Sequence, residues 1–184
     1  MDKLCKYGTH RVIYPLGVLP QSADKLDNNM TCMDNEILID VKTLNIDSAS
    51  FTQIKNACNE DKEKMEEMIL DIVNTKGKMQ NPVTGSGGML LGTIKEVGKD
   101  ITKDVKAGDE IASLVSLSLT PLKINAIKAI HLHKDQVDIE GQAVLFETGI
   151  FAKIPNDIPP HIALSALDVA GAPAQVKNLV KKND

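Results

Sequence analysis

Four short β-leaning runs, separated by turn residues, follow Pro82 and constrain the fold more than any other feature. These runs cover residues 90–97, 110–117, 123–132 and 143–153. Regularly spaced short strands are typical of antiparallel sheets that close into a barrel. The sequence therefore predicts a mainly β domain with helices, and a barrel is its expected architecture.

The first half of the chain contains one clear strand. Over residues 36–46, Ile37, Ile39 and Val41 alternate with other side chains, which is the period of a half-buried strand. The preceding amino-terminal segment is rich in proline and glycine, so it is expected to be extended chain on the surface of the sheet.

Two helices are predicted after this strand. Asp47 and Ser48 can cap the first, because a short side-chain oxygen accepts hydrogen bonds from the free amides at a helix start. The second covers residues 62–73, and Gly77 is its expected end. Its methionine and isoleucine residues recur at helical spacing, which favours core packing over a cofactor site.

The pattern changes again near residue 159. Residues 161–167 and 174–180 have helical patterns, with a Gly-Ala-Pro break between them. We therefore predict two parts, a domain over residues 1–158 and linker helices over residues 159–184.

Composition limits the possible partners. A net charge of -4 and an aromatic content of 3% argue against nucleic acid, which requires a basic surface and often stacking rings. The three cysteines lie far apart in the sequence and do not indicate a disulfide framework, so a reducing, cytoplasmic setting is expected. The sequence has neither an apolar leader nor a run long enough to cross a membrane, and no membrane association is expected.

The glycine-rich segment at residues 85–92 resembles a dinucleotide fingerprint only superficially. Leu90 occupies the position of the last glycine, and the following residues favour a strand instead of a helix. A tight turn that leads into a strand is the favoured interpretation.

Two motifs carry a resemblance to a known superfamily. The sequence GTIKEVG at 92–98, followed by VKAGDEIA at 105–112, resembles the GxVxxVG…VxxGDxV signature of medium-chain dehydrogenases. Longer stretches resemble one family within it, the 3,5-diaminohexanoate dehydrogenases of lysine fermentation. They are YGTHRV (7–12), TLNIDSASFTQ (43–53), NPVTGSGGM (81–89), LVSLSLTPL (114–122) and ALDVAGAPAQV (166–176).

The resemblance implies a GroES-like β-barrel whose linker helices lead towards a Rossmann domain that lies beyond Asp184. We therefore expect the amino-terminal, substrate-binding part of an enzyme, as a truncated or split chain that is inactive alone. The implied reaction is oxidative deamination of a diamino acid with NAD or NADP, which the missing domain would mainly bind. The full-length enzyme is expected to form a homo-oligomer.

The resemblance also implies that catalytic zinc is absent. Ile46, Gly88 and Met89 occupy the positions at which zinc-dependent relatives carry a cysteine and a His-Glu pair, and none of these three residues can bind zinc. His131 and His133 alternate on a predicted strand and would offer only two ligands, so solvated or packing histidines are favoured.

Three residues are candidate catalytic groups. Asp168 falls at the position of a third zinc ligand, and without metal we expect its carboxylate to receive a substrate ammonium group. A helix cap or a salt bridge explains Asp168 equally well. Ser48 matches a proton-relaying hydroxyl, and Asp47 precedes it, although both also suit the predicted helix cap.

Further residues are candidate substrate ligands. Glu147 is a second possible ammonium partner, although an exposed residue at a strand end is favoured. Thr84 and Ser86 are expected to donate hydrogen bonds to the substrate carboxylate, together with the backbone amides of Gly87 and Gly88.

Two other functions fit the same residues. A zinc-independent quinone or enoyl reductase shares the expected barrel and also lacks the metal ligands. A free-standing GroES-like module would bind a partner without catalysis.

Overall fold

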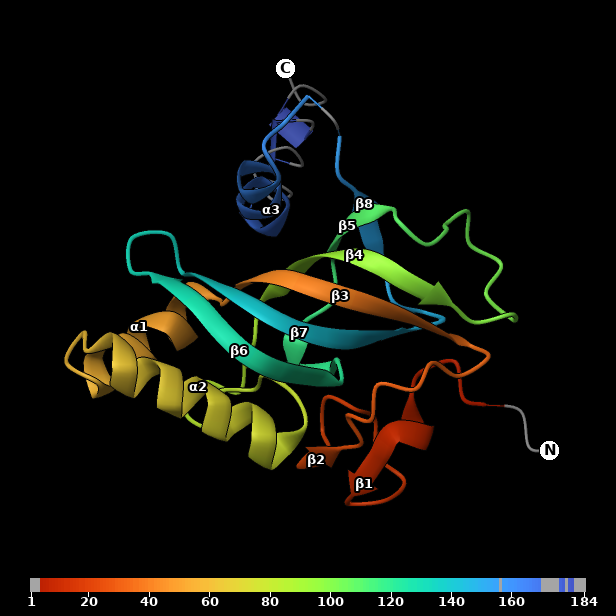
Figure 1. Ribbon diagram of the computed structural model, residues 1–184, viewed down its shortest axis with the longest axis horizontal. Helices are drawn as coiled ribbons and strands as arrows, with labels where there is room; N and C mark the ends of the chain where they lie inside the picture. The colour runs from red at the N-terminus through yellow and green to blue at the C-terminus, as the bar shows by residue number, and fades with distance from the viewer. Residues whose placement is uncertain (1–3, 156, 170–175, 178, 181–184) are drawn as a thin grey trace.

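The computed structural model describes residues 4–155, 157–169, 176–177 and 179–180. Its centre is a six-stranded antiparallel sheet with the strand order β6-β7-β3-β4-β5-β8 (Figure 1). The strands are β3 (Glu36–Asn45), β4 (Met89–Val97), β5 (Glu110–Ser113), β6 (Leu122–His131), β7 (Gln136–Phe146) and β8 (Phe151–Lys153). The chain is thus mainly β with a few helices, as its sequence predicts.

The sheet is open in the described part of the chain. Strands β6 and β8 are its two edges and do not pair with each other there, so the expected barrel is not closed. Irregular register bends two strands, in β3 between Val41 and Thr43 and in β6 between Ile124 and Ala126. The sheet therefore curves without closing.

The main core lies between one face of the sheet and two helices, α1 (Ser48–Ala57) and α2 (Lys62–Lys76) (Figure 1). From β3, Ile37, Ile39 and Val41 are buried in this core, as their alternation predicts. From α2, Met65 and Ile69 are fully buried in the same cluster. The methionine stripe is therefore core, as predicted.

Both helices begin at predicted or typical capping residues. The Asp47 carboxylate accepts a hydrogen bond from the Ser50 amide at the start of α1. Asp61 likewise accepts hydrogen bonds from the amides of Glu63 and Lys64 at the start of α2. Gly77 ends α2 with a positive φ of 70°, as predicted.

The bounds predicted for two strands are wrong. The strand predicted over 110–117 ends at Ser113, because the Ser116 side chain caps a short 3-10 helix, η2 (Leu117–Leu119). The strand predicted over 143–153 is divided into β7 and β8. A turn separates them, in which the Gly149 amide donates to the Phe146 carbonyl at 2.8 Å.

The carboxy-terminal helix α3 (Pro160–Val169) covers part of the face of the sheet opposite the main core (Figure 1). Leu164 is fully buried there against Met89, Leu91 and Ala112. This helix confirms the prediction over 161–167, whereas the helix predicted over 174–180 lies largely outside the described residues.

The amino-terminal segment packs against the sheet, as predicted. It contains a 3-10 helix, η1 (Thr9–Arg11), and a small two-stranded sheet, β1 (Val12–Tyr14) and β2 (Lys25–Leu26). The Arg11 guanidinium forms a buried ion pair with Glu36 at the start of β3, with 2.6 Å between Nη2 and Oε2. Arg11 thereby connects this segment to the main sheet.

Lys78, which follows α2, is fully buried. Its Nζ donates to the carbonyls of Pro20 at 2.7 Å and Gln21 at 3.1 Å. Burial, assisted by the charge of Lys76, lowers its pKa from 10.5 to about 8. Because the folded pKa is depressed, the charged amine costs stability below about pH 8, and this cost disappears as the pH rises towards 10.5.

We expect the Lys78 amine to titrate with a midpoint near 8. Lysine ¹³Cε shifts measured by NMR against pH would give the midpoint, with Lys78→Met identifying the resonance. A midpoint near the ordinary value of 10.5 would show that burial does not perturb this amine.

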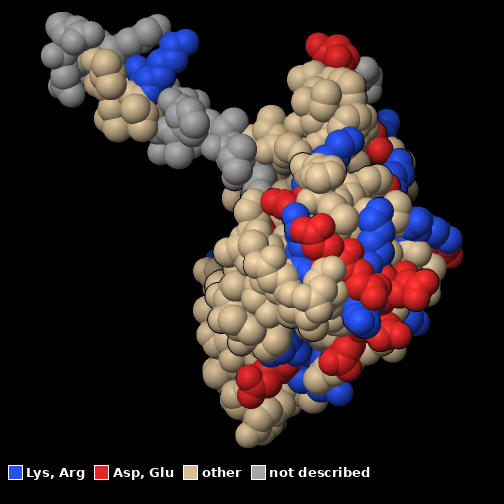
Figure 2. All heavy atoms as spheres, turned by 90° about the vertical axis from the view of Figure 1, so that its left-hand side faces the viewer, with Lys and Arg blue, Asp and Glu red and all other residues tan. Residues whose placement is uncertain are grey.

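Charged side chains gather on one side of the molecule, on the right in Figure 2, whereas the left-hand side of that view carries few. Ion pairs join strands of the sheet. Lys95–Asp40 at 3.6 Å and Lys128–Glu140 at 2.8 Å connect neighbouring strands, whereas Lys42–Glu110 at 2.8 Å connects β3 with β5 across β4. Within the described residues, no helix combines the length and apolar character needed to cross a membrane.

Candidate functional site

The end of one central strand of the sheet lies beside the beginnings of its two neighbours. Asn45, the last residue of β3, pairs with Met89, the first residue of β4, and with Gln136, the first residue of β7. The loops next to these ends carry most of the candidate site residues. We call this region the strand-end cluster; it comprises residues 45–48, 81–89 and 135–136.

Asp47 and Ser48 lie at the start of α1 within this cluster. Only Asp47 caps the helix, through its Oδ1, which lies 3.0 Å from the Ser50 amide nitrogen. Its Oδ2 is buried and has no hydrogen-bond partner among the described residues. The Ser48 hydroxyl instead donates to Asp135 Oδ2 at 2.7 Å. Ser48 thus connects to a second carboxylate across the cluster.

Asn81 shapes the loop that carries Thr84 and Ser86. Its side-chain oxygen accepts hydrogen bonds from the amides of Val83 (2.8 Å) and Thr84 (3.3 Å). Its side-chain nitrogen donates to Gln53 Oε1 at 2.7 Å, which fastens the loop to α1. The side-chain hydrogen bonds of this fully buried asparagine therefore stabilise the conformation of the loop that carries Thr84 and Ser86.

The Thr84 hydroxyl of this loop is already hydrogen-bonded within the protein. Thr84 Oγ1 lies 2.5 Å from the hydroxyl of Ser50, which is fully buried in α1. Thr84 Oγ1 also accepts a hydrogen bond from the Ser86 amide at 3.3 Å. The Ser86 side chain remains partly exposed.

Gly87 and Gly88 allow close contact between segments of backbone. A Cβ at Gly87 would lie 2.3 Å from the Met79 carbonyl oxygen, and one at Gly88 would lie 2.0 Å from the Asn45 carbonyl oxygen. Gly88 also has a φ of +98°. Strand β4 follows directly, so these glycines form a packed turn, as favoured from the sequence, and offer no open cradle for a pyrophosphate.

Gly88→Ala is therefore expected to destabilise the fold by at least about 3 kcal/mol, through backbone strain and the steric clash together. Gly85→Ala is the matched control, because Gly85 has a φ of +74° but open space around it. Its expected cost is about 1–2 kcal/mol, from strain alone. Chemical denaturation of both variants measures the difference, and equal losses would contradict the close contact at Gly88.

The structure does not bring Glu147 to the strand-end cluster. Glu147 follows Phe146, whose partner on β3 is Glu36, at the opposite end of the strand from Asn45. Strand β7 has 11 residues, so roughly 30 Å separate its two ends. Glu147 instead lines a surface hollow with Asn35 and Asp100.

Asp168 lies in α3, but its side chain falls outside the described residues. The backbone of α3 crosses the sheet near the strand-end cluster, since its Leu164 packs on Met89. Asp168 therefore lies near the end of α3, and its ammonium-binding role remains a prediction.

The histidine prediction is partly wrong. His131 ends β6 and lies 2.7 Å from Asp138 Oδ2 through its Nε2, whereas His133 lies in the following turn. The two residues therefore do not share a strand face, because β6 ends at His131. Within the described part of the chain, no group of three or more His, Cys, Asp or Glu residues could hold a metal ion.

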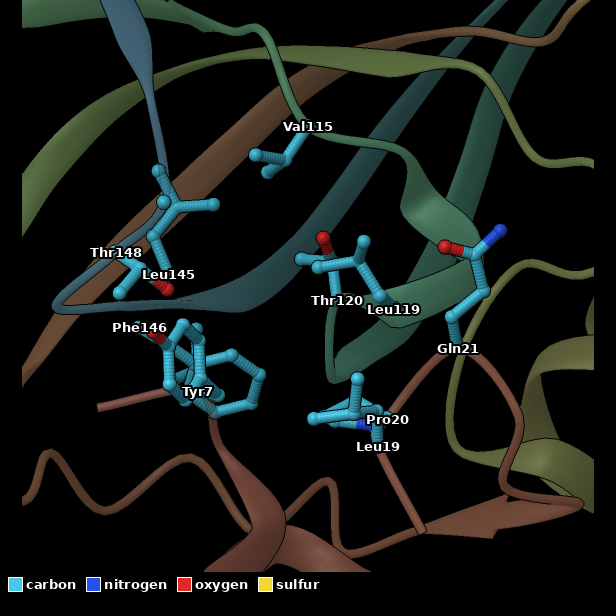
Figure 3. A pocket seen from close by; sticks show the side chains of 12 residues that line it. Tyr7, Leu19, Pro20, Gln21, Val115, Leu119, Thr120, Leu145, Phe146 and Thr148 are labelled. Carbon is cyan, nitrogen blue, oxygen red and sulfur yellow. The ribbon is translucent and has the colours of Figure 1, made fainter. Parts of the chain in front are cut away.

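An apolar pocket with a volume of about 180 Å³ lies elsewhere. Figure 3 shows the rings of Tyr7 and Phe146 on one side of it and Leu19 and Pro20 on another. Its lining residues include no charged side chain. The ammonium and carboxylate groups of a diamino acid need charged partners when they are buried, so this pocket does not suit such a substrate.

Comparison with known proteins identifies the family. Residues 10–155 match the family model described as the L-erythro-3,5-diaminohexanoate dehydrogenase N-terminal domain. The chain belongs to this family.

Two curated relatives carry the name L-erythro-3,5-diaminohexanoate dehydrogenase. The protein from Fusobacterium nucleatum is 61% identical over 98% of this chain, and the one from Acetoanaerobium sticklandii is 59% identical over 99%. The matches cover 53% and 54% of the relatives, so the chain spans about half of their length. Among solved structures, a crystal structure of CurK enoyl reductase aligns with 80% of this chain and 35% of its own, with 16% identity and a TM-score of 0.42.

Four residues in or next to the strand-end cluster were not predicted from the sequence: Ser50, Asn81, Asp135 and Gln136. The Asn81-Pro82 pair is a turn-initiating dipeptide and was a usable signal for Asn81. The other three acquire their partners only through tertiary contacts, such as that between Ser48 and Asp135.

Proposed function

We propose that this chain is the substrate-binding portion of an NAD(P)-dependent amine dehydrogenase. The proposed enzyme oxidises L-erythro-3,5-diaminohexanoate at C3 by hydride transfer to NAD(P), and water then hydrolyses the resulting imine to 5-amino-3-oxohexanoate and ammonia, in lysine fermentation. The observation that carries this proposal is the family match over residues 10–155. Residues 1–158 would form the substrate-binding domain, and residues 159–184 would lead into the nucleotide-binding domain.

The proposed relation to GroES-like domains of medium-chain dehydrogenases rests on where the superfamily signature falls. Its first part lies on β4 and its Gly-Asp pair lies in the turn before β5. In that turn Gly108 has a φ of +93°, and Asp109 Oδ2 accepts a hydrogen bond from the Lys106 amide at 3.1 Å. These features explain why the signature requires glycine and aspartate at this turn.

The strand-end cluster offers groups for the proton chemistry of amine oxidation. The reaction requires a neutral amine at C3 and an acceptor for its proton. Ser48 Oγ donates to Asp135 Oδ2, so its lone pairs are free to accept a hydrogen bond from a substrate ammonium group. In our proposal a proton passes from the ammonium through Ser48 Oγ to Asp135, which is partly exposed to solvent.

Other groups in the cluster are proposed to hold the substrate. Asp47 Oδ2 is buried and lacks a hydrogen-bond partner among the described residues, and we propose that it accepts a hydrogen bond from an ammonium group. The Ser86 hydroxyl suits the substrate carboxylate, and Asp168 is proposed to bind the second ammonium group. Because Glu147 lies at the other end of β7, we leave it out of this site.

The proposal requires neither zinc nor a nucleotide site in this chain. Ile46, Gly88 and Met89 occupy the positions at which zinc-dependent medium-chain dehydrogenases carry zinc ligands, and these three residues cannot bind zinc. The glycine turn packs against backbone and does not fit a nucleotide phosphate. The nicotinamide nucleotide would accept the hydride, and we propose that residues beyond those described bind it.

A substrate panel on the full-length protein tests the proposal. We expect reduction of NAD or NADP with L-erythro-3,5-diaminohexanoate, and an ammonia-dependent reverse reaction with 5-amino-3-oxohexanoate. Reduction of quinones or enoyl thioesters without ammonia, and no activity with the diamino acid, would contradict it. That outcome would favour the zinc-independent reductase alternative.

A further inference from the structure

Gln136 joins α3 to the strand-end cluster. Its side chain is only 3% exposed at the start of β7. Its Nε2 lies 3.1 Å from Asn45 Oδ1, 3.3 Å from the His161 carbonyl oxygen and 3.1 Å from Ser165 Oγ. A single buried amide thus bridges a strand end and the first two turns of α3.

The hydrogen-bond partners of Gln136 on β3 and on α3 lie close in sequence to different candidate site residues. Asn45 is followed at once by Ile46, Asp47 and Ser48. On α3, Asp168 comes seven residues after His161 and three after Ser165, a spacing at which helix residues share one face. Gln136 therefore bonds to the strand end that directly precedes Asp47 and Ser48 and to the helix that carries Asp168.

We infer that Gln136 is a positioning residue of the substrate site. It holds α3 at a fixed distance and angle from the end of β3, and so holds Asp168 relative to Ser48. Leu164 docks the same helix through apolar contacts, which resist separation but define orientation less strictly than hydrogen bonds do. This inference rests on the function proposed above.

The amide group suits this role better than other side chains. Its two N–H donors serve three acceptors, so one donor is shared. Gln136→Met would remove the Nε2 donor from all three contacts, although the His161 carbonyl would still accept a hydrogen bond from Ser165 Oγ at 3.1 Å. Gln136→Glu would place a carboxylate against the same acceptors. Both changes preserve the approximate size of the side chain.

Hydrogen exchange in this chain tests the docking of α3. We expect Gln136→Met and Gln136→Glu to raise exchange of the α3 amides by about tenfold or more, since lost buried hydrogen bonds favour local opening. Gln142→Met is the matched control, because Gln142 lies on the same strand and donates to Asp40 Oδ1 at 2.8 Å on the exposed side. It should leave α3 exchange unchanged.

Kinetics of the full-length protein test the consequence for catalysis. We expect both Gln136 variants to lower kcat for the diamino acid on the order of 10- to 100-fold, with a smaller effect on KM, because misplaced catalytic groups slow the chemical step. A role in packing alone predicts near-normal kcat in Gln136→Met. If that variant does not fold, Ser165→Ala removes one acceptor at an exposed position and gives the same readouts.

The outcomes separate the inference from the proposed function. Unchanged α3 exchange in both Gln136 variants, or a fall in kcat without a rise in exchange, would overturn the positioning role. If the wild-type protein does not act on the diamino acid, the proposed function fails, and α3 exchange alone decides whether Gln136 docks the helix.

Discussion

Replacing Arg11 by methionine is expected to lower the free energy of unfolding by about 3–5 kcal/mol, the usual cost of removing one partner of a buried ion pair. The side chains of Arg11 and Glu36 are 1% and 0% exposed. The guanidinium also donates to the carbonyls of Asn29 and Thr31, so its loss removes several hydrogen bonds. Urea denaturation followed by circular dichroism measures this change.

Lys42→Met is the matched control for this prediction. Lys42 pairs with Glu110 at 2.8 Å, but the two side chains are 55% and 33% exposed. Solvent weakens such pairs, so the expected loss is below about 1 kcal/mol. Similar losses in the two variants would contradict a special role for the buried pair.

The same pair predicts a dependence on pH. Burial alone would raise the pKa of Glu36, but hydrogen bonds from Arg11 and His10 outweigh burial and lower it from 4.5 to about 2. A depressed folded pKa means that ionised Glu36 stabilises the fold above about pH 4.5 and loses this contribution as the pH falls towards 2. The stability difference between the wild type and Arg11→Met should therefore shrink over that range.

Asp168→Asn in the full-length protein is expected to lower kcat/KM for the diamino acid roughly 10²- to 10⁴-fold. The proposal gives its carboxylate the task of holding a substrate ammonium group, and loss of a charged partner at an active site has effects of this size. Steady-state rates with varied substrate give the separate effects on kcat and KM.

Asp157→Asn is the control for Asp168, because Asp157 is an exposed acidic residue just before α3. It should leave both constants unchanged. Normal kinetics in Asp168→Asn would remove Asp168 from the site, and an equal loss in both variants would indicate a general effect of charge near this helix.

The parts of the fold with simple periodicity were predictable from the sequence. The alternation at Ile37, Ile39 and Val41 and the helical spacing around Met65 reflect burial of one face of a strand and one face of a helix. Such a pattern appears in residues that are close in sequence. Strand ends were less predictable: the turn at Thr148 and Gly149 interrupts an apolar run that has no strong breaker before it.

The candidate site was only partly predictable for a different reason. Asp47, Ser48, Thr84 and Ser86 lie within the strand-end cluster, and the family resemblance located them. Sequence separation does not say at which end of a strand a residue lies, so Glu147 was grouped with residues at the other end of β7. The bridge through Gln136 depends on three segments that meet only in the folded chain.

The central claim is that the diamino acid binds at the strand-end cluster. Titration of this chain with L-erythro-3,5-diaminohexanoate, followed by backbone amide shifts in NMR spectra, tests it most directly. We predict that the largest saturable changes occur at Ser48, Ser86 and Gly88, with no change at Glu147. Changes centred on Glu147 and Asp100, with none at Ser48, would contradict the location proposed for the substrate site.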